Sequence, residues 1–172
     1  MTTRARIVTS IVAAAGLLGG GCAYTTSTAL LPSHIHTVAI PTFENATTEY
    51  TLEQTLTEAV VKRFVQDNHL KLVDEKSADA VIQGRITAYR NAVFGISDIT
   101  HAQEYRVTIT CAVVFKDQVR NRELWNEPNM VKTANYYVVD VPGQKAKTEL
   151  DGRQEAIDKI ADEILSRSVE GW

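Results

Sequence analysis

The sequence predicts an α+β fold, a two-layer sandwich in which two helices pack on one face of a mixed or antiparallel sheet of four to five strands. Three observations lead to this prediction. One long stretch alternates apolar with polar residues, as a half-buried strand does. Two other segments carry apolar residues at helical spacing, so each has a stripe to bury. Because several strands separate these two segments, both helices are expected to share one face of the sheet.

The alternating stretch runs from Glu104 to Lys116. Its apolar positions are Tyr105, Val107, Ile109, Cys111, Val113 and Phe115. A strand of this length needs partners along its whole edge, since each unpaired buried peptide group costs free energy comparable to a lost hydrogen bond. We therefore expect this strand at the centre of the sheet, with Cys111 on its buried face.

Residues 1–21 have the layout of a secretory signal. Two arginines make the start positive, an apolar run of about a dozen residues follows, and three glycines end it. This run is shorter than the roughly 20 apolar residues that a membrane-spanning helix needs. We expect residues 1–21 to be removed, residues 22–36 to form a lipidated linker, and residues 37–172 to fold as one domain.

Cys22 follows the glycines directly, which is typical of a bacterial lipoprotein signal. In such proteins this cysteine becomes the first residue and carries an S-diacylglycerol group and an N-acyl chain such as palmitate. Two or three acyl chains anchor a protein firmly, at ~0.8 kcal/mol per buried CH₂. Ala23 stands where aspartate would retain a lipoprotein in the inner membrane, so the likeness implies the outer membrane. A plain secretory signal with a chance cysteine stays open, because Gly19 occupies the place where lipoprotein signals usually have leucine.

The first elements of the domain are a strand and a helix. The strand is expected from Thr37 to Ile40, where Pro41 closes its edge. The helix is expected from about Glu49 to Gln66, with Thr47 or Thr48 capping its start. Its buried stripe consists of Leu52, Leu56, Ala59, Val60 and Phe64.

Two strands are expected next. Leu70 and Leu72 alternate in a short strand, and the second strand runs from Ala80 to Tyr89. One face of the second strand would hold Ile82, Gly84, Ile86 and Ala88. A glycine in mid-strand, such as Gly84, indicates a bulge or the close approach of a helix.

The second half of the domain is expected to hold the rest of the sheet and the second helix. Residues 91–103 form a loop or a long hairpin, and residues 117–121 form a polar turn. Residues 123–137 form one long, interrupted strand, because Pro128 cannot donate to a regular ladder. The last helix runs from about Glu149 to Val169. Its buried face consists of Ile157, Ile160, Ala161, Ile164 and Ser168.

The sheet face away from the helices is expected to meet water or a hydrophilic partner. It would carry Arg85, Thr87, Arg106, Thr108 and Thr110. The net charge of −3, without a cluster of Lys or Arg, argues against binding to nucleic acid.

No motif in the sequence supports an enzyme. The chain has no serine elbow, phosphate-binding glycine loop or metalloprotease helix motif, so we predict no catalysis and no cofactor. His34 and His36 lack a third ligand nearby, so we predict no metal site. These exclusions leave a lipid-tethered binding module.

Several stretches together have the order and spacing of one family. They are Gly21-Cys22-Ala23-Tyr24, Leu31-Pro32-Ser33-His34-Ile35, Val38-Ala39-Ile40-Pro41-Thr42-Phe43-Glu44-Asn45, Glu49-Tyr50, Leu52-Glu53-Gln54-Thr55-Leu56, Ala78-Asp79-Ala80-Val81-Ile82-Gln83-Gly84, Glu104-Tyr105-Arg106-Val107-Thr108-Ile109-Thr110 and Glu170-Gly171-Trp172. In these stretches the chain resembles the lipopolysaccharide-assembly lipoprotein family, LptE. The resemblance implies an outer-membrane lipoprotein that binds lipopolysaccharide and plugs the β-barrel translocon LptD. It also implies a lipid-anchored position facing the periplasm and the barrel lumen, and the same two-layer fold.

The resemblance further implies where lipopolysaccharide would bind. The family uses basic side chains in two loops to contact the anionic head of the lipid. In this chain the loop before the last helix offers Lys145 and Lys147. The loop of residues 91–103 has no Lys or Arg, so Arg90 at its edge is the nearest substitute. The alternative that Lys145 and Lys147 are merely solvated loop charges stays open.

A second functional hypothesis fits the same tether and fold. The protein would then be a lipid-anchored periplasmic accessory module of another envelope complex, such as a secretion channel or a peptidoglycan-linked assembly. Fold alone does not separate the two hypotheses, because function resides in sites. The partner separates them.

Overall fold

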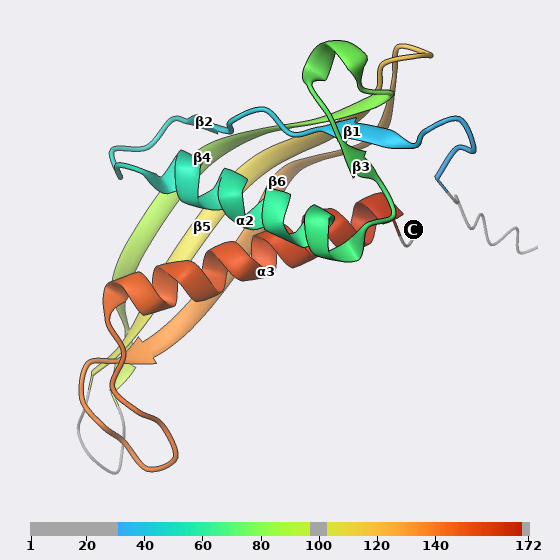
Figure 1. Cartoon of the computed structure of the whole chain (residues 1–172). Coiled ribbons are helices and arrows are strands. Elements are labelled where there is room, and N and C mark those ends of the chain that lie inside the picture. The colour runs from blue at the N-terminus through green and yellow to red at the C-terminus, as the bar shows by residue number, and fades with distance from the viewer. Residues whose placement is uncertain (1–30, 97–102, 170–172) are drawn as a thin grey trace, which may run out of the picture.

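The computed structural model describes residues 31–96 and 103–169 (Figure 1). The predicted signal peptide and the lipidation site Cys22 therefore lie outside the described residues. The elements, in chain order, are β1 (Thr37–Ala39), β2 (Glu44–Asn45), α2 (Leu52–Asp67), β3 (Lys71–Leu72), the 3₁₀ helix η2 (Glu75–Ser77), β4 (Ala80–Ile96), β5 (Gln103–Asp117), β6 (Arg122–Tyr137) and α3 (Glu149–Val169). Among these described elements, no helix is long and apolar enough to span a membrane.

The predicted two-layer α+β sandwich is confirmed. In the described part of the chain, the strands form one six-stranded sheet with the order β3-β1-β4-β5-β6, and β2 pairs with β4. The long strands β4, β5 and β6 are antiparallel, whereas the short strands pair in parallel. Both helices lie on the same side of this sheet (Figure 1). The sheet exceeds the predicted strand number because β2, of two residues, was too short to show a pattern.

The core lies between the helices and the sheet. β5 pairs with β4 on one edge and with β6 on the other, so it has partners on both edges as expected, although β4 is the middle strand of the sheet. The core is lined from β5 by Val107, Ile109, Cys111, Val113 and Phe115, and from the helices by Leu52, Leu56, Val60, Phe64, Ile157, Ile160 and Ile164. Burial raises the pKa of the Cys111 thiol to about 12, so this cysteine stays a neutral core residue.

A bulge at Thr87 changes which residues of β4 face the helices. Ile86 pairs with Cys111 and Ala88 pairs with Thr110, so Thr87 is an extra residue in β4. Beyond the bulge the alternation is inverted, and Tyr89 packs against the core while Ala88 is exposed. The prediction that Ala88 shares a face with Ile86 was therefore wrong.

Gly84 is explained by a close approach, but not that of a helix. A Cβ atom at Gly84 would lie only 1.9 Å from Cε1 of Phe43. The Phe43 ring belongs to the segment before α2 and is 2% exposed. Glycine is therefore needed because an aromatic ring occupies the space that a side chain would fill.

The start of α2 differs from the prediction. α2 begins at Leu52, and neither Thr47 nor Thr48 caps it. Thr47 instead binds the side chain of Asn45, with its backbone N and Oγ1 2.9 and 2.8 Å from Asn45 Oδ1. The N-cap residue is Thr51, whose φ of 65° is left-handed, and its side chain makes no capping bond.

α3 has the predicted bounds, and its start is capped reciprocally. Thr148 donates from its backbone N and its Oγ1 to Asp151 Oδ2, at 2.7 and 2.8 Å. The backbone N of Asp151 donates to Thr148 Oγ1 at 3.2 Å. These bonds satisfy helix N–H groups that would otherwise lack partners.

β6 is an edge strand and is interrupted, as predicted. Its pairing with β5 shifts register between Cys111 and Val113, opposite the segment that contains Pro128. Further along, Lys159 of α3 donates from Nζ to the backbone oxygen of Thr133, at 2.9 Å. The outer edge of this strand is thus broken by a proline and partly covered by a helix side chain.

The segment before β1 is packed on the domain. Ile35 is 3% exposed, so the last residues of the predicted linker contribute to the core. His34 Nε2 lies 2.9 Å from Oδ2 of the fully buried Asp117 at the end of β5. Asp79 accepts hydrogen bonds from Thr37 N and Thr37 Oγ1, at 2.9 and 2.8 Å. The chain therefore enters the domain at a fixed place beside the β5–β6 turn.

The molecule is elongated, with a narrow end that we call the tip. The tip consists of residues 92–95, 103–105 and 138–148, which are the ends of β4 and β5 and the loop before α3 (Figure 1). The segment of residues 31–36 lies at the opposite end of the molecule (Figure 1).

Candidate functional site

The candidate site lies on the outer face of the sheet, where two arginines come together beside the tip. Arg90 of β4 is paired in register with Thr108 of β5, and Ala92 is paired with Arg106. Paired residues share a face of the sheet, so both arginines project away from the helices. Without the extra residue at Thr87, Arg90 would have pointed into the core. The bulge is thus what brings the two guanidinium groups to one surface.

Arg106 is fixed by its neighbours. Its Cζ atom lies 3.1 Å from the ring centroid of Phe94, and its Nε donates to Asn135 Oδ1 at 2.7 Å. Asn135 Nδ2 in turn donates to Glu104 Oε1 at 2.7 Å. Stacking on an aromatic ring and a bound Nε leave the other guanidinium donors available in a fixed direction.

Arg90 is exposed and makes no hydrogen bond or ion pair with any other residue that the structure describes. Between the two arginines lies an open depression of about 250 Å³. It is lined by Arg90, Ala92, Val93, Phe94, Arg106 and Thr108. Two guanidinium groups and a hydroxyl suit a phosphate group, because arginine donates in a fork that matches its oxygens.

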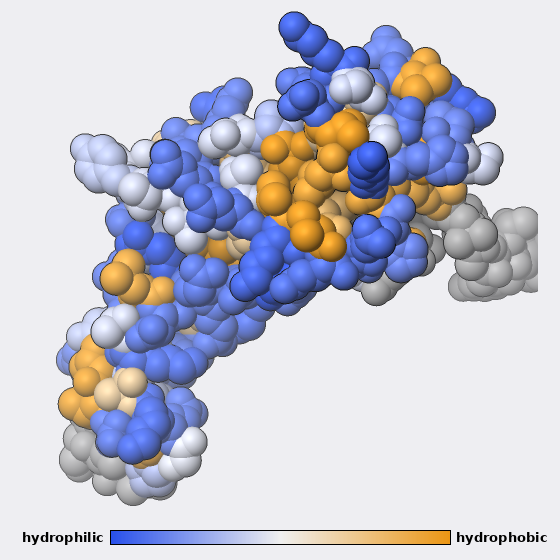
Figure 2. Space-filling view, in the orientation of Figure 1, coloured by the Kyte–Doolittle hydropathy of each residue, from blue (hydrophilic) through white to orange (hydrophobic). Residues whose placement is uncertain are grey.

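The tip beside this depression is unusually apolar for an exposed surface. Val93 and Phe94 are both 53% exposed, and Val138 and Val139 in the loop before α3 are 54% and 50% exposed. Hydrophobic side chains are visible there among hydrophilic ones (Figure 2). Of these residues, Val93 and Phe94 line the depression itself, so exposed apolar groups adjoin the two arginines.

The predicted binding residues do not form one cluster. Lys145 is 92% exposed and its Nζ lies 3.6 Å from Asp140 Oδ2. Lys147 donates from Nζ to Glu155 Oε2 of α3 at 2.8 Å, a bond that lowers the pKa of Glu155. The structure therefore places Lys147 against a helix, whereas Arg90 lies on the opposite side of the sheet.

Sequence reasoning assigned Arg106 only to a polar face and missed Phe94. The alternation of β5 showed which face of the sheet carries Arg106. The β4 residues that lie beside Arg106, however, depend on the register between β4 and β5. Phe94 lay in the segment treated as a loop, and nothing in its neighbours indicated that its ring would lie under an arginine.

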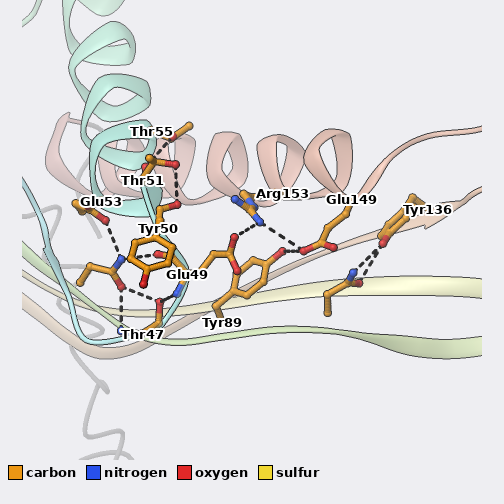
Figure 3. A network of polar contacts seen from close by, with 12 residues as sticks. Thr47, Glu49, Tyr50, Thr51, Glu53, Thr55, Tyr89, Tyr136, Glu149 and Arg153 are labelled. Atoms are coloured by element: carbon orange, nitrogen blue, oxygen red, sulfur yellow. Dashed lines mark hydrogen bonds and ion pairs between the residues drawn. The ribbon is translucent and has the colours of Figure 1, made fainter.

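A second polar cluster lies on the helix side and joins three elements (Figure 3). Tyr89 OH donates to Glu149 Oε1 at 2.5 Å, and Arg153 Nη2 lies 3.4 Å from the same oxygen. Arg153 also pairs with Glu49 in the segment before α2. Burial and the bond to Glu149 raise the pKa of Tyr89 to about 12, and the bond from Tyr89 lowers the pKa of Glu149. The cluster fixes the start of α3 against β4 and the α2 segment.

Tyr89→Phe is expected to lower the free energy of unfolding by about 2 kcal/mol, because it removes a hydrogen bond to a charged group in a half-buried place. Equilibrium urea denaturation measures the change. The matched control is Tyr137→Phe, since the Tyr137 hydroxyl makes no hydrogen bond with the other described residues; it should change stability by less than about 0.5 kcal/mol. Equal stability of the two variants would contradict the role of the cluster.

The comparisons with known proteins bear on the whole domain. A protein-family model described as "LptE: Lipopolysaccharide-assembly" matches residues 35–168, which is most of the chain. This chain belongs to the LptE family. The suspected resemblance is thereby confirmed, and the family is one of lipopolysaccharide-assembly lipoproteins that are not enzymes. Membership indicates a membrane-associated lipoprotein. No curated protein sequence matches the chain.

Several solved structures share the fold of this LptE-family protein. Protein XCC0632 from Xanthomonas campestris is 9% identical with a TM-score of 0.55, and the match covers 81% of this chain and 88% of that one. A PelC variant from Paraburkholderia phytofirmans, solved as a dodecamer, is 12% identical with a TM-score of 0.51, covering 86% and 96%. The hypothetical protein CT253 from Chlamydia trachomatis is 13% identical with a TM-score of 0.50, covering 77% and 95%. At these identities the likeness concerns the fold alone.

Proposed function

We propose that this protein binds lipopolysaccharide at the outer face beside its tip and serves as the lipoprotein plug of an LptD-type β-barrel in the outer membrane. Family membership supports the general role. The observation that carries the binding site is the open depression in which Arg90 and Arg106 lie beside the exposed ring of Phe94.

The chemistry of lipopolysaccharide fits this depression. Its phosphates need cations, and the protein as a whole is acidic with a net charge of −3, so a local pair of arginines must supply the attraction. Its acyl chains need an apolar surface, which Val93, Phe94 and the exposed valines of the loop before α3 provide. Lys145 and Lys147 are weaker candidates because each already has a carboxylate partner.

The attachment point of the tether fits a plug. The lipid on Cys22 would hold the end of the domain where residues 31–36 enter, opposite the tip (Figure 1). Nine peptide units separate Cys22 from Leu31, which allows a reach of roughly 30 Å when extended. The tip is then the part of the domain farthest from the anchored end, and the polar outer sheet face would lie against the hydrophilic barrel lumen.

Binding of labelled lipopolysaccharide to the purified lipoprotein tests the site. The double variant Arg90→Ala, Arg106→Ala is expected to raise the dissociation constant at least about 30-fold, because it removes two charge-assisted contacts. The matched control is Lys145→Ala, Lys147→Ala, which removes the same charge at the same end of the molecule and should change the constant less than about 3-fold.

The reverse ranking of the two double variants would move the site to the loop before α3. For the plug role, the tagged protein is purified from outer membranes in mild detergent. A stoichiometric large β-barrel that stays bound supports the proposal. Recovery with a secretion or peptidoglycan component instead would favour the accessory role in another envelope complex.

A further inference from the structure

The segment before α2 displays a single aromatic side chain to solvent. Tyr50 is 86% exposed, the highest value among the large hydrophobic residues described. With so much of the ring in solvent, burial of Tyr50 contributes little to the stability of the fold. Tyrosine is nevertheless enriched among the residues that contribute most to protein–protein binding, since it offers a large area at low conformational cost.

The segment that carries Tyr50 is held rigidly by side-chain hydrogen bonds (Figure 3). Asn45 Nδ2 donates to Glu49 O and to Glu53 Oε2, both at 2.7 Å. Asn45 Oδ1 accepts from the backbone and hydroxyl of Thr47, and Thr47 Oγ1 accepts from Glu49 N at 3.2 Å. The Glu49 carboxylate is in turn paired with Arg153 of α3. Tyr50 therefore projects from an ordered support rather than from a loose loop.

The backbone beside Tyr50 adopts a conformation that its sequence disfavours. Thr51 has a φ of 65°, and a β-branched residue in the left-handed region is strained. Thr51 Oγ1 donates to Tyr50 O at 2.6 Å, and Thr55 N donates to Thr51 O at 3.0 Å, so the strained turn is fixed on both sides. Strain of this kind persists only where surrounding contacts impose it, and it tends to mark functional segments.

The charges around Tyr50 indicate the chemistry of the partner. The stretch from Glu44 to Glu58 contains four glutamates and no Lys or Arg. Arg85 and Arg153 neutralise two of them from neighbouring elements, which leaves a net negative surface around the aromatic ring. A partner pocket that is lined by apolar groups and rimmed by Lys or Arg would complement both the ring and the negative electrostatic potential around it.

We propose that Tyr50 anchors this protein to its protein partner by entering a pocket that is rimmed by basic residues. The hydrogen bonds centred on Asn45 hold Tyr50 in its binding position before the partner is bound. The inference rests on the proposed function, because it takes the LptD-type barrel as that partner. It adds a contact that is separate from the arginine depression, since Tyr50 lies before α2 and Arg90 and Arg106 lie on the sheet face away from the helices.

The test uses the full lipoprotein and the LptD-type barrel of the same organism, purified together in detergent, with dissociation of the complex measured. Tyr50→Ala is expected to weaken binding about 30-fold, whereas Tyr50→Phe should stay within about 3-fold of the parent. The matched control is Val119→Ala in the β5–β6 turn, which truncates a side chain that is 63% exposed and should leave binding unchanged.

A second variant tests the support while leaving the anchor in place. Asn45→Ala removes the side-chain bonds that order the segment, and it should raise the dissociation rate about 5-fold or more because the anchor is no longer pre-formed. If Tyr50→Ala binds like the parent, the inference is overturned and the plug role stands. If the parent itself does not hold the barrel, both are overturned.

Discussion

Gly84→Ala is expected to destabilise the protein by about 3 kcal/mol, at the upper end of overpacking effects. The added Cβ would lie 1.9, 2.2 and 2.7 Å from three atoms of the Phe43 ring. That ring is buried, and the backbone N of Phe43 is held by a 3.0 Å bond to Thr57 Oγ1 of α2, so a shift of the ring would disturb the packing around it. Either the ring or the strand must shift. Equilibrium urea denaturation followed by circular dichroism measures the loss.

Gly95→Ala is the matched control for this prediction. Gly95 lies in the same strand, and a Cβ there would meet only Glu104 Oε2, at 3.5 Å. We expect its effect to stay within about 0.5 kcal/mol. Phe43→Leu added to Gly84→Ala should recover part of the lost stability, because a smaller side chain makes room for the Cβ. Equal stability of the two alanine variants would show that Phe43 does not pack on Gly84.

Asp117→Ala is expected to lower the free energy of unfolding by about 3 kcal/mol, because it removes the buried carboxylate that holds Arg120, His34 and Arg122 together. Asp117 is fully buried at the end of β5. Its Oδ1 accepts from Arg120 N at 2.9 Å, and its Oδ2 lies 2.9 Å from His34 Nε2 and 3.6 Å from Arg122 Nε. The substitution therefore loosens both the β5–β6 turn and the segment that leads to the tether.

Asp117→Asn is the matched control, since it keeps an acceptor oxygen and the shape of the side chain. We expect it to cost about half as much as alanine. Burial alone would raise the pKa of Asp117, but the bonds from Arg120 and His34 hold it below its ordinary value of 3.8. The stabilisation by the charged form is thus present above that value and is lost as the pH falls through the folded pKa. The parent should lose stability in that acidic range more steeply than Asp117→Asn.

Strong periodicity made much of the fold predictable. β5, α2 and α3 are each buried on one side, and this burial determines at every position whether the residue is apolar or polar. The resulting pattern therefore extends along the whole element and is visible in the sequence. The bounds of α3 were predictable because apolar spacing and charged ends agree. Pro128 made the interruption of β6 predictable, since a residue without an N–H group breaks the hydrogen-bond ladder of any sheet.

Other features depend on contacts between distant residues and left no local signal. The bulge at Thr87 is followed by Ala88 and Tyr89, which both tolerate either face of a sheet. Thr47, one of the two threonines expected to cap α2, binds the side chain of Asn45 instead, and this alternative partner is set by the folded segment. The pairing of Arg90 with Arg106 on one face required both the register of two strands and the bulge.

The broken outer edge of β6 has a consequence for a protein held on a membrane. Anchored lipoproteins are confined to two dimensions, where chance encounters between copies are frequent. An open strand edge offers a row of free peptide groups, and two such edges can join into a continuous sheet. Pro128 has no backbone N–H to donate, and the register shift bends the strand. Lys159 donates a hydrogen bond to the carbonyl oxygen of Thr133, so this oxygen already has a partner. The protein can therefore be crowded beside its own copies without polymerising through this edge.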